Sequence, residues 1–246
     1  MSLHLIEVPV KINEIHKWAV SRGLYKREVD ESRALHHLLN EIFGPRSLQP
    51  FRLKVPPKRN SGNLYAYSNN SAETLLNTAQ IAIKPNESRI FMLDDLRSIP
   101  RSFENWNSGQ EIGFDVRVRP TIRLSSEITA NGRVFPKGVE LDAFQAALLR
   151  NDKSKSREEV YLEWLKIRIS PFGILNERLT KMRKYQRLKV YRNDQRIDGP
   201  DVVFHGTATI HDIGIFTNYL GRGIGRHCAY GYGMLLLYPP QKLHKN

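Results

Sequence analysis

The chain has 246 residues, with 38 Lys and Arg against 25 Asp and Glu, which gives a formal charge of +13. Hydrophobic residues make up 40% of the chain, enough for a buried core, so this is not a disordered basic tail. Because unpaired cations are rarely buried, the excess charge lies on the surface and suits a polyanion such as nucleic acid. An anionic membrane is the competing partner, but no basic amphipathic helix leaves an apolar face free for lipid.

The cysteine content and the apolar runs exclude several further classes of protein. Cys228 is the only cysteine, so neither an intrachain disulfide nor a Cys-based zinc site can form. The first residues read as a strand without the apolar core of a signal peptide, and the late run MLLLY is too short to span a membrane. The Asp and Glu residues show no metal-ligand pattern. We therefore expect a soluble cytoplasmic protein with no metal and no cofactor.

The first hundred residues alternate between strand-like and helix-like patterns. We expect, in order, strand 3–10, helices 12–21 and 30–43, strands 51–55 and 64–68, helix 72–80 and strand 90–93. Asp30 and Ser71 are suited to cap two of these helices, and Gly44 to end one. Residues 97–110 have no period and read as a linker. The order β-α-β-β-α-β is that of a ferredoxin-like domain.

The same order repeats after the linker. We expect strand 112–123, a helix at 141–150 inside a turn-rich insertion, helix 157–168, strands 182–192 and 201–210, a helix from Asp212 to before Gly221, and strand 229–238. Ser156 and Glu159 form a capping box for one helix. The predicted fold is α+β, with tandem ferredoxin-like (RRM-like) domains at 1–100 and 111–246. A single irregular α+β domain is the alternative.

The strand expected at 182–192 mixes cations with aromatic residues. Its odd positions should share one face, and they are Arg183, Tyr185, Arg187, Lys189 and Tyr191. Cations meet phosphates and rings stack on bases, so we interpret this face as an RNA-binding surface. An ordinary solvated sheet face would show the same alternation. Arg117, Arg119 and Arg123 add a second basic row.

A glycine-rich segment follows the last expected helix. Its five glycines are Gly221, Gly223, Gly225, Gly231 and Gly233. Glycine permits positive φ and lets backbone N–H groups approach a phosphate. No Gly-Lys-Ser/Thr follows, which excludes a P-loop, and the segment precedes a strand rather than opening a helix, which excludes a dinucleotide fingerprint. We expect Gly223 and Gly225, with the neighbouring Arg222, Arg226 and His227, to bind RNA.

This segment, GIGRHCAYGYGMLLL, resembles the C-terminal glycine-rich signature of CRISPR repeat-associated RNA-binding proteins, and its form is closest to the CasE-type endoribonucleases. Three other segments agree with that branch in the same order, namely ESRALHHLLNEIFG at 31–44, GFDVRVRPTIR at 113–123 and GPDVVFHGTATIHD at 199–212. The resemblance implies tandem ferredoxin-like domains and metal-independent cleavage of a CRISPR repeat hairpin. It also implies that the enzyme stays bound to its guide RNA product, which bridges it to other effector subunits such as the backbone protein.

Cleavage of RNA without a metal needs a base for the 2′-OH, an acid for the leaving 5′ oxygen and a group that stabilises the phosphorane charge. Histidine suits the first two roles. On helix 30–43, His36 falls at the edge of the apolar stripe beside Arg33, whereas His37 lies nearly opposite the stripe and would pair with Glu41. The residues alone also allow His36 to be a boundary histidine without a role. The resemblance selects it, because the family's catalytic histidine follows the leucine of this motif.

The second catalytic residue is left open. In family members with a catalytic tyrosine, that residue often precedes the histidine by three positions, where this chain has Arg33. Either Arg33 stabilises the phosphorane or Tyr25 enters from the preceding loop, and His227 is a third candidate. The alternative function is a non-catalytic RNA-binding subunit of a CRISPR effector complex. A general RRM-type protein is a further alternative, but its aromatic signature segment is not found.

Overall fold

The computed structural model describes residues 2–24, 30–130, 132–150, 154–192 and 195–241, with side chains described except at 189–197. The chain forms two compact units, one of residues 1–107 with 213–236 and the other of 108–212 with 237–246. The expected domains, 1–100 and 111–246, were defined by the β-α-β-β-α-β order that occurs twice along the sequence. The compact units are instead defined by which residues pack together, and on this basis the segment 213–236 belongs to the first unit.

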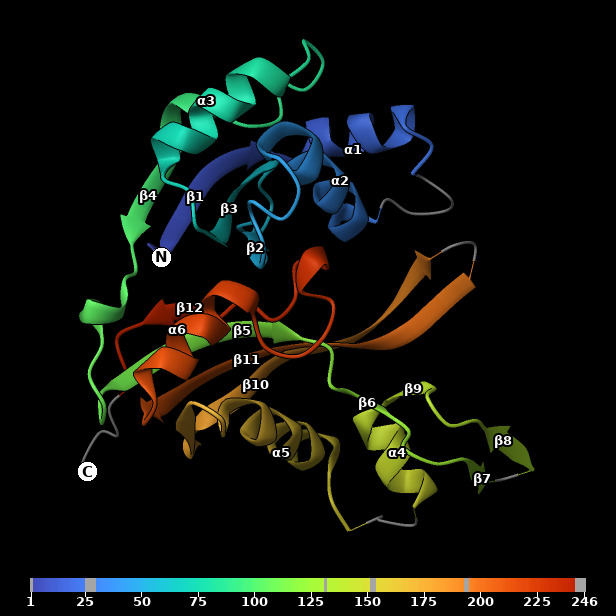
Figure 1. Ribbon diagram of the computed structural model, residues 1–246. Coiled ribbons are helices and arrows are strands. Elements are labelled where there is room, and N and C mark those ends of the chain that lie inside the picture. Colours follow the sequence, from blue (N-terminus) through green and yellow to red (C-terminus); the bar gives the residue numbers. More distant parts are fainter. Residues whose placement is uncertain (1, 25–29, 131, 151–153, 193–194, 242–246) are drawn as a thin grey trace. The chain divides into compact units, whose positions relative to one another are not determined.

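The first unit is a four-stranded antiparallel sheet with helices over one face (Figure 1). Its elements are β1 (His4–Lys11), α1 (Ile12–Ser21), α2 (Glu31–Phe43), β2 (Phe51–Lys54), β3 (Ser61–Ser68), α3 (Ala72–Ala82), η1 (Leu93–Asp95), β4 (Arg97–Pro100), η2 (Phe103–Asn105), α6 (Ile213–Arg222) and η3 (Cys228–Tyr230). The sheet order β2-β3-β1-β4 is the order of a ferredoxin-like domain.

The core of the first unit forms where the alternating apolar residues of β1 pack against the apolar stripe of α2. Ile6, Val8 and Val10 point to one face of the sheet and are fully buried, as are Leu38 and Ile42 of the helix. Fixing this stripe against the sheet also fixes the phase of α2. The half-exposed flanks of the helix are therefore held in a defined orientation.

The fourth strand of the first unit is not where the sequence predicted it. Residues 90–93 were expected as a strand, but only Phe91 makes an isolated bridge, to Val10, and Ile90 and Phe91 are apolar because they are buried in the core. The strand β4 lies instead within the expected linker 97–110, at the edge of the sheet, where Pro100 is tolerated because its missing N–H faces no partner strand.

The second unit repeats the same sheet with a longer hairpin and an insertion (Figure 1). Its elements are β5 (Glu111–Val118), β6 (Thr121–Arg123), β7 (Ile128–Ala130), β8 (Arg133–Phe135), β9 (Glu140–Asp142), α4 (Ala143–Leu149), α5 (Arg157–Ile169), β10 (Gly173–Arg192), β11 (Gln195–Ile210) and β12 (Leu236–Tyr238). The sheet order is β10-β11-β5-β12, again the ferredoxin-like order. Strand β6 pairs with β9 and β7 with β8, and these short pairs with α4 make up the insertion.

Three boundaries in the second unit differ from the expectation. The strand predicted at 112–123 divides at Pro120, which cannot donate to the ladder, and its second part joins β9. Strand β10 begins at Gly173, nine residues before the predicted 182–192. The strand predicted at 229–238 is reduced to β12, because Gly231 and Gly233 adopt positive φ. The capping box of Ser156 and Glu159 on α5 is confirmed.

The predicted class, α+β with tandem ferredoxin-like domains, is therefore confirmed. Across the stretches of chain that the structure describes, no helix has both the length and the apolar character needed to cross a membrane.

Candidate functional site

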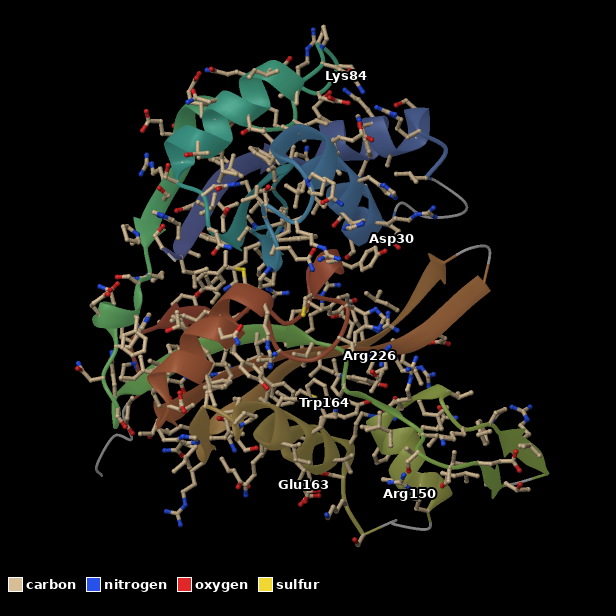
Figure 2. All side chains as sticks on the ribbon, in the orientation of Figure 1. Asp30, Lys84, Arg150, Glu163, Trp164 and Arg226 are labelled. Atoms are coloured by element: carbon tan, nitrogen blue, oxygen red, sulfur yellow. The ribbon has the colours of Figure 1, made fainter. Side chains whose placement is uncertain are left out.

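His36 lies on α2 at the border between the buried and exposed faces of the helix. The helix begins after Asp30, whose carboxylate accepts a hydrogen bond from the N–H of Arg33 at 3.0 Å, and Figure 2 labels this N-cap residue. His36 is half-buried beside the apolar stripe, as the helical phase predicted. Its imidazole is accessible from solvent while its rotamers are restricted by packing.

His37 is also half-buried, and its ring lies edge-on to that of His36 with centroids 5.4 Å apart. The expected pairing of His37 with Glu41 is wrong. The Glu41 carboxylate instead meets Arg22 at 3.0 Å and Lys84 at 3.7 Å, two cations that follow α1 and α3 (Figure 2 labels Lys84). Glu41 therefore ties α2 to its neighbouring helices, and this role leaves His37 without its predicted partner.

Asn40 lies one turn after His36 and presents its amide to the imidazole. The Asn40 carbonyl oxygen accepts a hydrogen bond from the N–H of Arg46 at 3.1 Å, which fixes the Nδ2 end of the amide towards His36. That nitrogen lies 3.3 Å from Nε2 and 3.4 Å from Nδ1 of His36. Because the two distances are nearly equal, the amide favours neither tautomer. Asn40 therefore limits the position of the ring without deciding which nitrogen carries a proton.

Tyr230 also contacts His36 and was not singled out from the sequence. It is the last residue of η3, and its ring centroid lies 4.7 Å from that of His36, with the two planes inclined by 37°. The contact joins α2 to the glycine-rich segment within the first unit. The only sequence signal for it was an aromatic residue between closely spaced glycines.

The glycine-rich segment is a tightly packed loop rather than an open chain. The N–H of Gly223 donates to Tyr219 O at 2.8 Å, and the N–H of Ile224 donates to Gly233 O at 2.8 Å, which closes the loop. A Cβ at Gly233 would collide with the carbonyl oxygen of Ile224, and one at Gly223 would lie 2.9 Å from Cys228 Sγ. These glycines are therefore required by packing, and the N–H of Gly223, which was expected to face a phosphate, is used at the end of α6.

Other features of the loop fix the position of η3. His227 adopts the left-handed conformation, with φ 65°, and its carbonyl accepts a hydrogen bond from the N–H of Tyr230 at 2.8 Å. A Cβ at Gly231 would lie 3.0 Å from the Phe51 ring of β2. Burial raises the pKa of the Cys228 thiol, which lies inside the loop, to about 11. The loop is thus packed on the sheet at several points.

The remaining candidates near this cluster fall into two groups. Arg33 is half-buried on the same helix as His36, and His227 packs near Tyr232, with ring centroids 6.4 Å apart. Tyr25 lies outside the described residues. Arg222 and Arg226 are exposed, and Figure 2 labels Arg226 on the loop. Gly225 is exposed beside them, so this edge of the loop keeps the character expected of a phosphate-binding surface.

The basic strand of the second unit does not form one uninterrupted face. The register between β10 and β11 shifts between Met182 and Lys184, which places Arg183 in a bulge and resets the alternation after it. Lys184 then lies opposite Val203, and Arg187 opposite Pro200. Both cations are exposed, as is Arg183. Lys189 belongs to the same strand, but its side chain lies outside the described part.

Tyr185 lies on the helix-covered face of this sheet. Its ring is 4.7 Å from the guanidinium carbon of Arg157 and 6.1 Å from the ring of Tyr161, both on α5. The Tyr161 hydroxyl donates to Asp142 at 2.8 Å. The Tyr161 pKa is raised mainly by burial and, to a smaller extent, by the negative charge of Asp142. The arrangement seals the junction of α5 with the sheet. It gives Tyr185 a packing role beside the RNA-stacking role expected from the sequence.

The second expected basic row is largely occupied by internal contacts. The guanidinium of Arg117 donates to both oxygens of Asp201, at 2.7 and 2.9 Å, and Gln186 donates to the same carboxylate at 2.6 Å. Arg119 was expected on an exposed face but is only 3% exposed. Its guanidinium lies where a Cβ at position 199 would be, so Gly199 makes room for it. Of the cations expected to bind RNA on these strands, the exposed ones are therefore on the hairpin rather than on β5.

The described residues contain no group of three or more His, Cys, Asp or Glu side chains arranged to hold a metal ion.

Comparisons with known proteins agree on one family. A family model described as CRISPR associated protein matches residues 3–239. Cse3 of Thermus thermophilus, bound to an RNA representing a pre-cleavage complex, is similar with a TM-score of 0.64 and 16% identity, covering 97% of this chain and 100% of that chain. Cas6e of Escherichia coli K-12 gives a TM-score of 0.56 and 15% identity, covering 96% and 99% of the two chains.

A chain of a CRISPR RNA-guided surveillance complex gives a TM-score of 0.54 and 18% identity, covering 95% of this chain and 98% of that chain. The search of curated protein sequences finds no match. The structural matches cover nearly the whole chain and share its two ferredoxin-like domains, and together with the family match they confirm the CasE-type resemblance. The chain therefore belongs to the CRISPR associated protein family.

Proposed function

We propose that this protein is a metal-independent endoribonuclease that binds the CRISPR repeat hairpin and cleaves precursor CRISPR RNA into guide RNAs. The observation that carries the proposal is the half-buried His36, held between Asn40 and Tyr230 in a chain of this family. The similar Cse3 structure contains an RNA representing a pre-cleavage complex, which supports an RNA substrate for this fold.

The chemistry assigned to this site is attack of a ribose 2′-OH on the adjacent phosphorus. A base removes the 2′-OH proton, the bond from phosphorus to the 5′ oxygen breaks, and an acid protonates that oxygen. The products are a 2′,3′-cyclic phosphate and a 5′-OH. His36 takes one of the two proton-transfer roles, since imidazole does so near neutral pH. Arg33, one turn earlier on α2, stabilises the charge on the phosphorane.

RNA binding is assigned to the exposed cations of the two units. In the second unit these are Arg183, Lys184 and Arg187, with Lys189 further along the strand. In the first unit they are Arg222 and Arg226 of the glycine-rich loop. Such cations bind phosphates and orient the hairpin without reading its sequence. The product stays bound as a guide, which links the enzyme to other effector subunits. The similarity to a chain of an RNA-guided surveillance complex supports this partnership.

The proposal is tested by incubating the protein with labelled repeat RNA in EDTA under single-turnover conditions. We expect cutting to continue and His36→Ala to slow it by about 10²-fold or more, the usual contribution of a positioned acid or base. Affinity for the uncut hairpin should hardly change, because many cations make up the contact surface. His37→Ala is the matched control at an adjacent histidine that contacts His36 edge-on; it should slow cutting far less than His36→Ala and leave affinity unchanged.

A 2′-deoxy substitution at the cut site should abolish cleavage and leave binding intact, because it removes the nucleophile. Continued cutting of that substrate would refute the mechanism. Tight binding without any cutting by the wild-type protein would instead identify a non-catalytic RNA-binding subunit.

A further inference from the structure

We propose that Tyr230 is a positioning residue for His36, and that the main task of the glycine-rich loop around it is to hold the catalytic imidazole in place. The inference rests on the proposed function, because it assigns a partner to the histidine of that site. It concerns residues far apart in the sequence that the first unit brings together.

The geometry at His36 supports this role. An exposed histidine on a helix surface exchanges between rotamers within nanoseconds, whereas proton transfer requires the imidazole within hydrogen-bond reach of the reacting oxygen. The Asn40 amide restricts the ring by contact, at 3.3 Å from Nε2. The Tyr230 ring packs against it with centroids 4.7 Å apart. The interplanar angle of 37° describes packing of two aromatic faces, so the tyrosine acts on His36 through its ring.

The loop is built to keep Tyr230 where it is. The residue before η3, His227, and the residue after it, Gly231, both adopt positive φ, at 65° and 78°. Left-handed residues at both ends give the short helix a fixed direction of entry and exit. Contact of Gly231 with Phe51 presses this turn onto β2. The hydroxyl of the fully buried Tyr67 donates to Leu235 O at 2.9 Å, which fastens the end of the loop to β3.

The loop therefore explains two observations together. Its glycines are needed where side chains would collide within the loop, and the N–H groups of Gly223, Ile224 and Tyr230 donate to backbone carbonyls of the loop or of α6. Only the edge with Gly225 and Arg226 is left for RNA. A loop that served mainly as a phosphate cradle would keep its N–H groups free. One that serves as a rigid support for an aromatic side chain would use some of them for its own closure, as the N–H groups of Gly223, Ile224 and Tyr230 are used here.

The experiment compares Tyr230→Phe, which keeps the ring, with Tyr230→Leu, which keeps apolar bulk and removes the ring. We expect Tyr230→Leu to lower the single-turnover cleavage rate about 10-fold to 10²-fold, the effect of a displaced catalytic group. Its Kd for the hairpin and its unfolding temperature should stay near those of the wild type. Tyr230→Phe should cut within about 3-fold of the wild-type rate, since the ring contact remains.

Tyr238→Leu is the matched control, the same change at an exposed tyrosine of β12, and it should cut like the wild type. In the free protein, the Hε1 proton signal of His36, assigned by its loss in His36→Gln, should move in Tyr230→Leu and not in Tyr238→Leu, because the ring current is removed.

Four outcomes decide the inference. Wild-type cleavage by Tyr230→Leu, or an unmoved His36 signal, would overturn it. Equal losses in Tyr230→Phe and Tyr230→Leu would also overturn it, because the hydroxyl would then be the active group. A wild-type protein that binds the hairpin without cutting it would refute the proposed function itself. Loss of cleavage in Tyr230→Leu with rescue by Tyr230→Phe supports the inference.

Discussion

In the first unit β2 and β3 are four and eight residues long, whereas their counterparts in the second unit, β10 and β11, have twenty and sixteen. Both units use the same sheet order, so the difference between the two main sheets lies in the length of this hairpin. Strand β5 pairs with β11 only along 202–209, which leaves the far end of the long hairpin two-stranded and basic. The short hairpin instead packs against the glycine-rich loop, through Phe51 of β2 and Tyr67 of β3.

Helices α2 and α5 of the two units also differ in whether their polar side chains are enclosed. On α5, Arg157 is enclosed by the Phe144 ring at 4.2 Å and the Tyr185 ring at 4.7 Å, and it pairs with Asp142 at 3.3 Å. On α2, His36 is left half-exposed on the flank. With the proposed function, one scaffold would carry two specialisations, with the proton-transfer chemistry in the first unit and most of the RNA-binding cations in the second.

The largest effect is expected from disturbing the loop in the first unit. Gly233→Ala introduces a Cβ that collides with Ile224 O at a backbone φ of 76°. Backbone strain of about 1 kcal/mol and overpacking of about 1–3 kcal/mol should lower the free energy of unfolding by about 2–4 kcal/mol. Urea denaturation measures this loss. Below the transition, cleavage should fall more than RNA affinity, because most of the cations proposed to bind RNA belong to the other unit.

Gly109→Ala separates the two contributions, because Gly109 has a φ of 82° but no atom within 4 Å of an added Cβ. It should show only the backbone cost of about 1 kcal/mol. Equal losses in both variants would show that the packing of the loop contributes nothing.

A second expected effect concerns the pH dependence of stability and also arises in the loop. Burial raises the pKa of the Cys228 thiol to about 11 in the folded protein, while an unfolded cysteine titrates near ~8.5. The folded chain keeps a proton that the unfolded chain releases at high pH. The contribution of the thiol to stability is therefore fully present below the pKa of the unfolded state, and it is lost as the pH rises through the pKa of the folded state. When the pH is raised from 8 to 10, the free energy of unfolding of the wild type should fall by about 2 kcal/mol more than that of Cys228→Ala.

The comparison with Cys228→Ala removes the effects of lysines and tyrosines that titrate in the same range, because both proteins contain them. Urea denaturation at several pH values supplies the measurement. Parallel pH curves for the two proteins would mean that the thiol is accessible to water and that the loop is open.

The smallest effect is expected from the hairpin of the second unit. Lys184→Ala with Arg187→Ala should weaken binding of the repeat hairpin about tenfold. The slope of the logarithm of the binding constant against the logarithm of salt concentration should become shallower by about 0.9 for each phosphate that is no longer neutralised. The cleavage rate at saturating protein should stay unchanged. Lys137→Ala with Lys166→Ala is the matched control, since it removes two exposed cations elsewhere in the unit. An equal loss of affinity in that control would assign binding to net charge rather than to the hairpin.

Local chemistry made most of the fold predictable from sequence. Asp30, Ser71 and Ser156 cap their helices as expected, because a capping side chain depends on residues two or three positions away. Residues 90–93 were mistaken for a strand because a buried turn can be as apolar as a strand. The bulge at Arg183 was missed because it depends on the partner strand, which alternation alone does not reveal.

The candidate site was predictable in part for the same reason. The half-buried position of His36 follows from the period of one helix. Its contact with Tyr230 does not, because it depends on the folding of a distant loop onto α2. The burial of Arg119 depends on an absent side chain at Gly199, on another strand. Whatever depends on one element was visible in the sequence, and whatever depends on two was not.

The discontinuity of the first unit has a consequence for the order of synthesis. A ribosome delivers α2 early, but residues 213–236, which complete that unit, emerge only after the entire basic hairpin has been made. A nascent chain thus carries its histidine without Tyr230, and its Phe51 and Tyr67 without the loop that covers them. Competence to cut RNA would then be the last property the growing protein acquires, after the means of holding the RNA are in place.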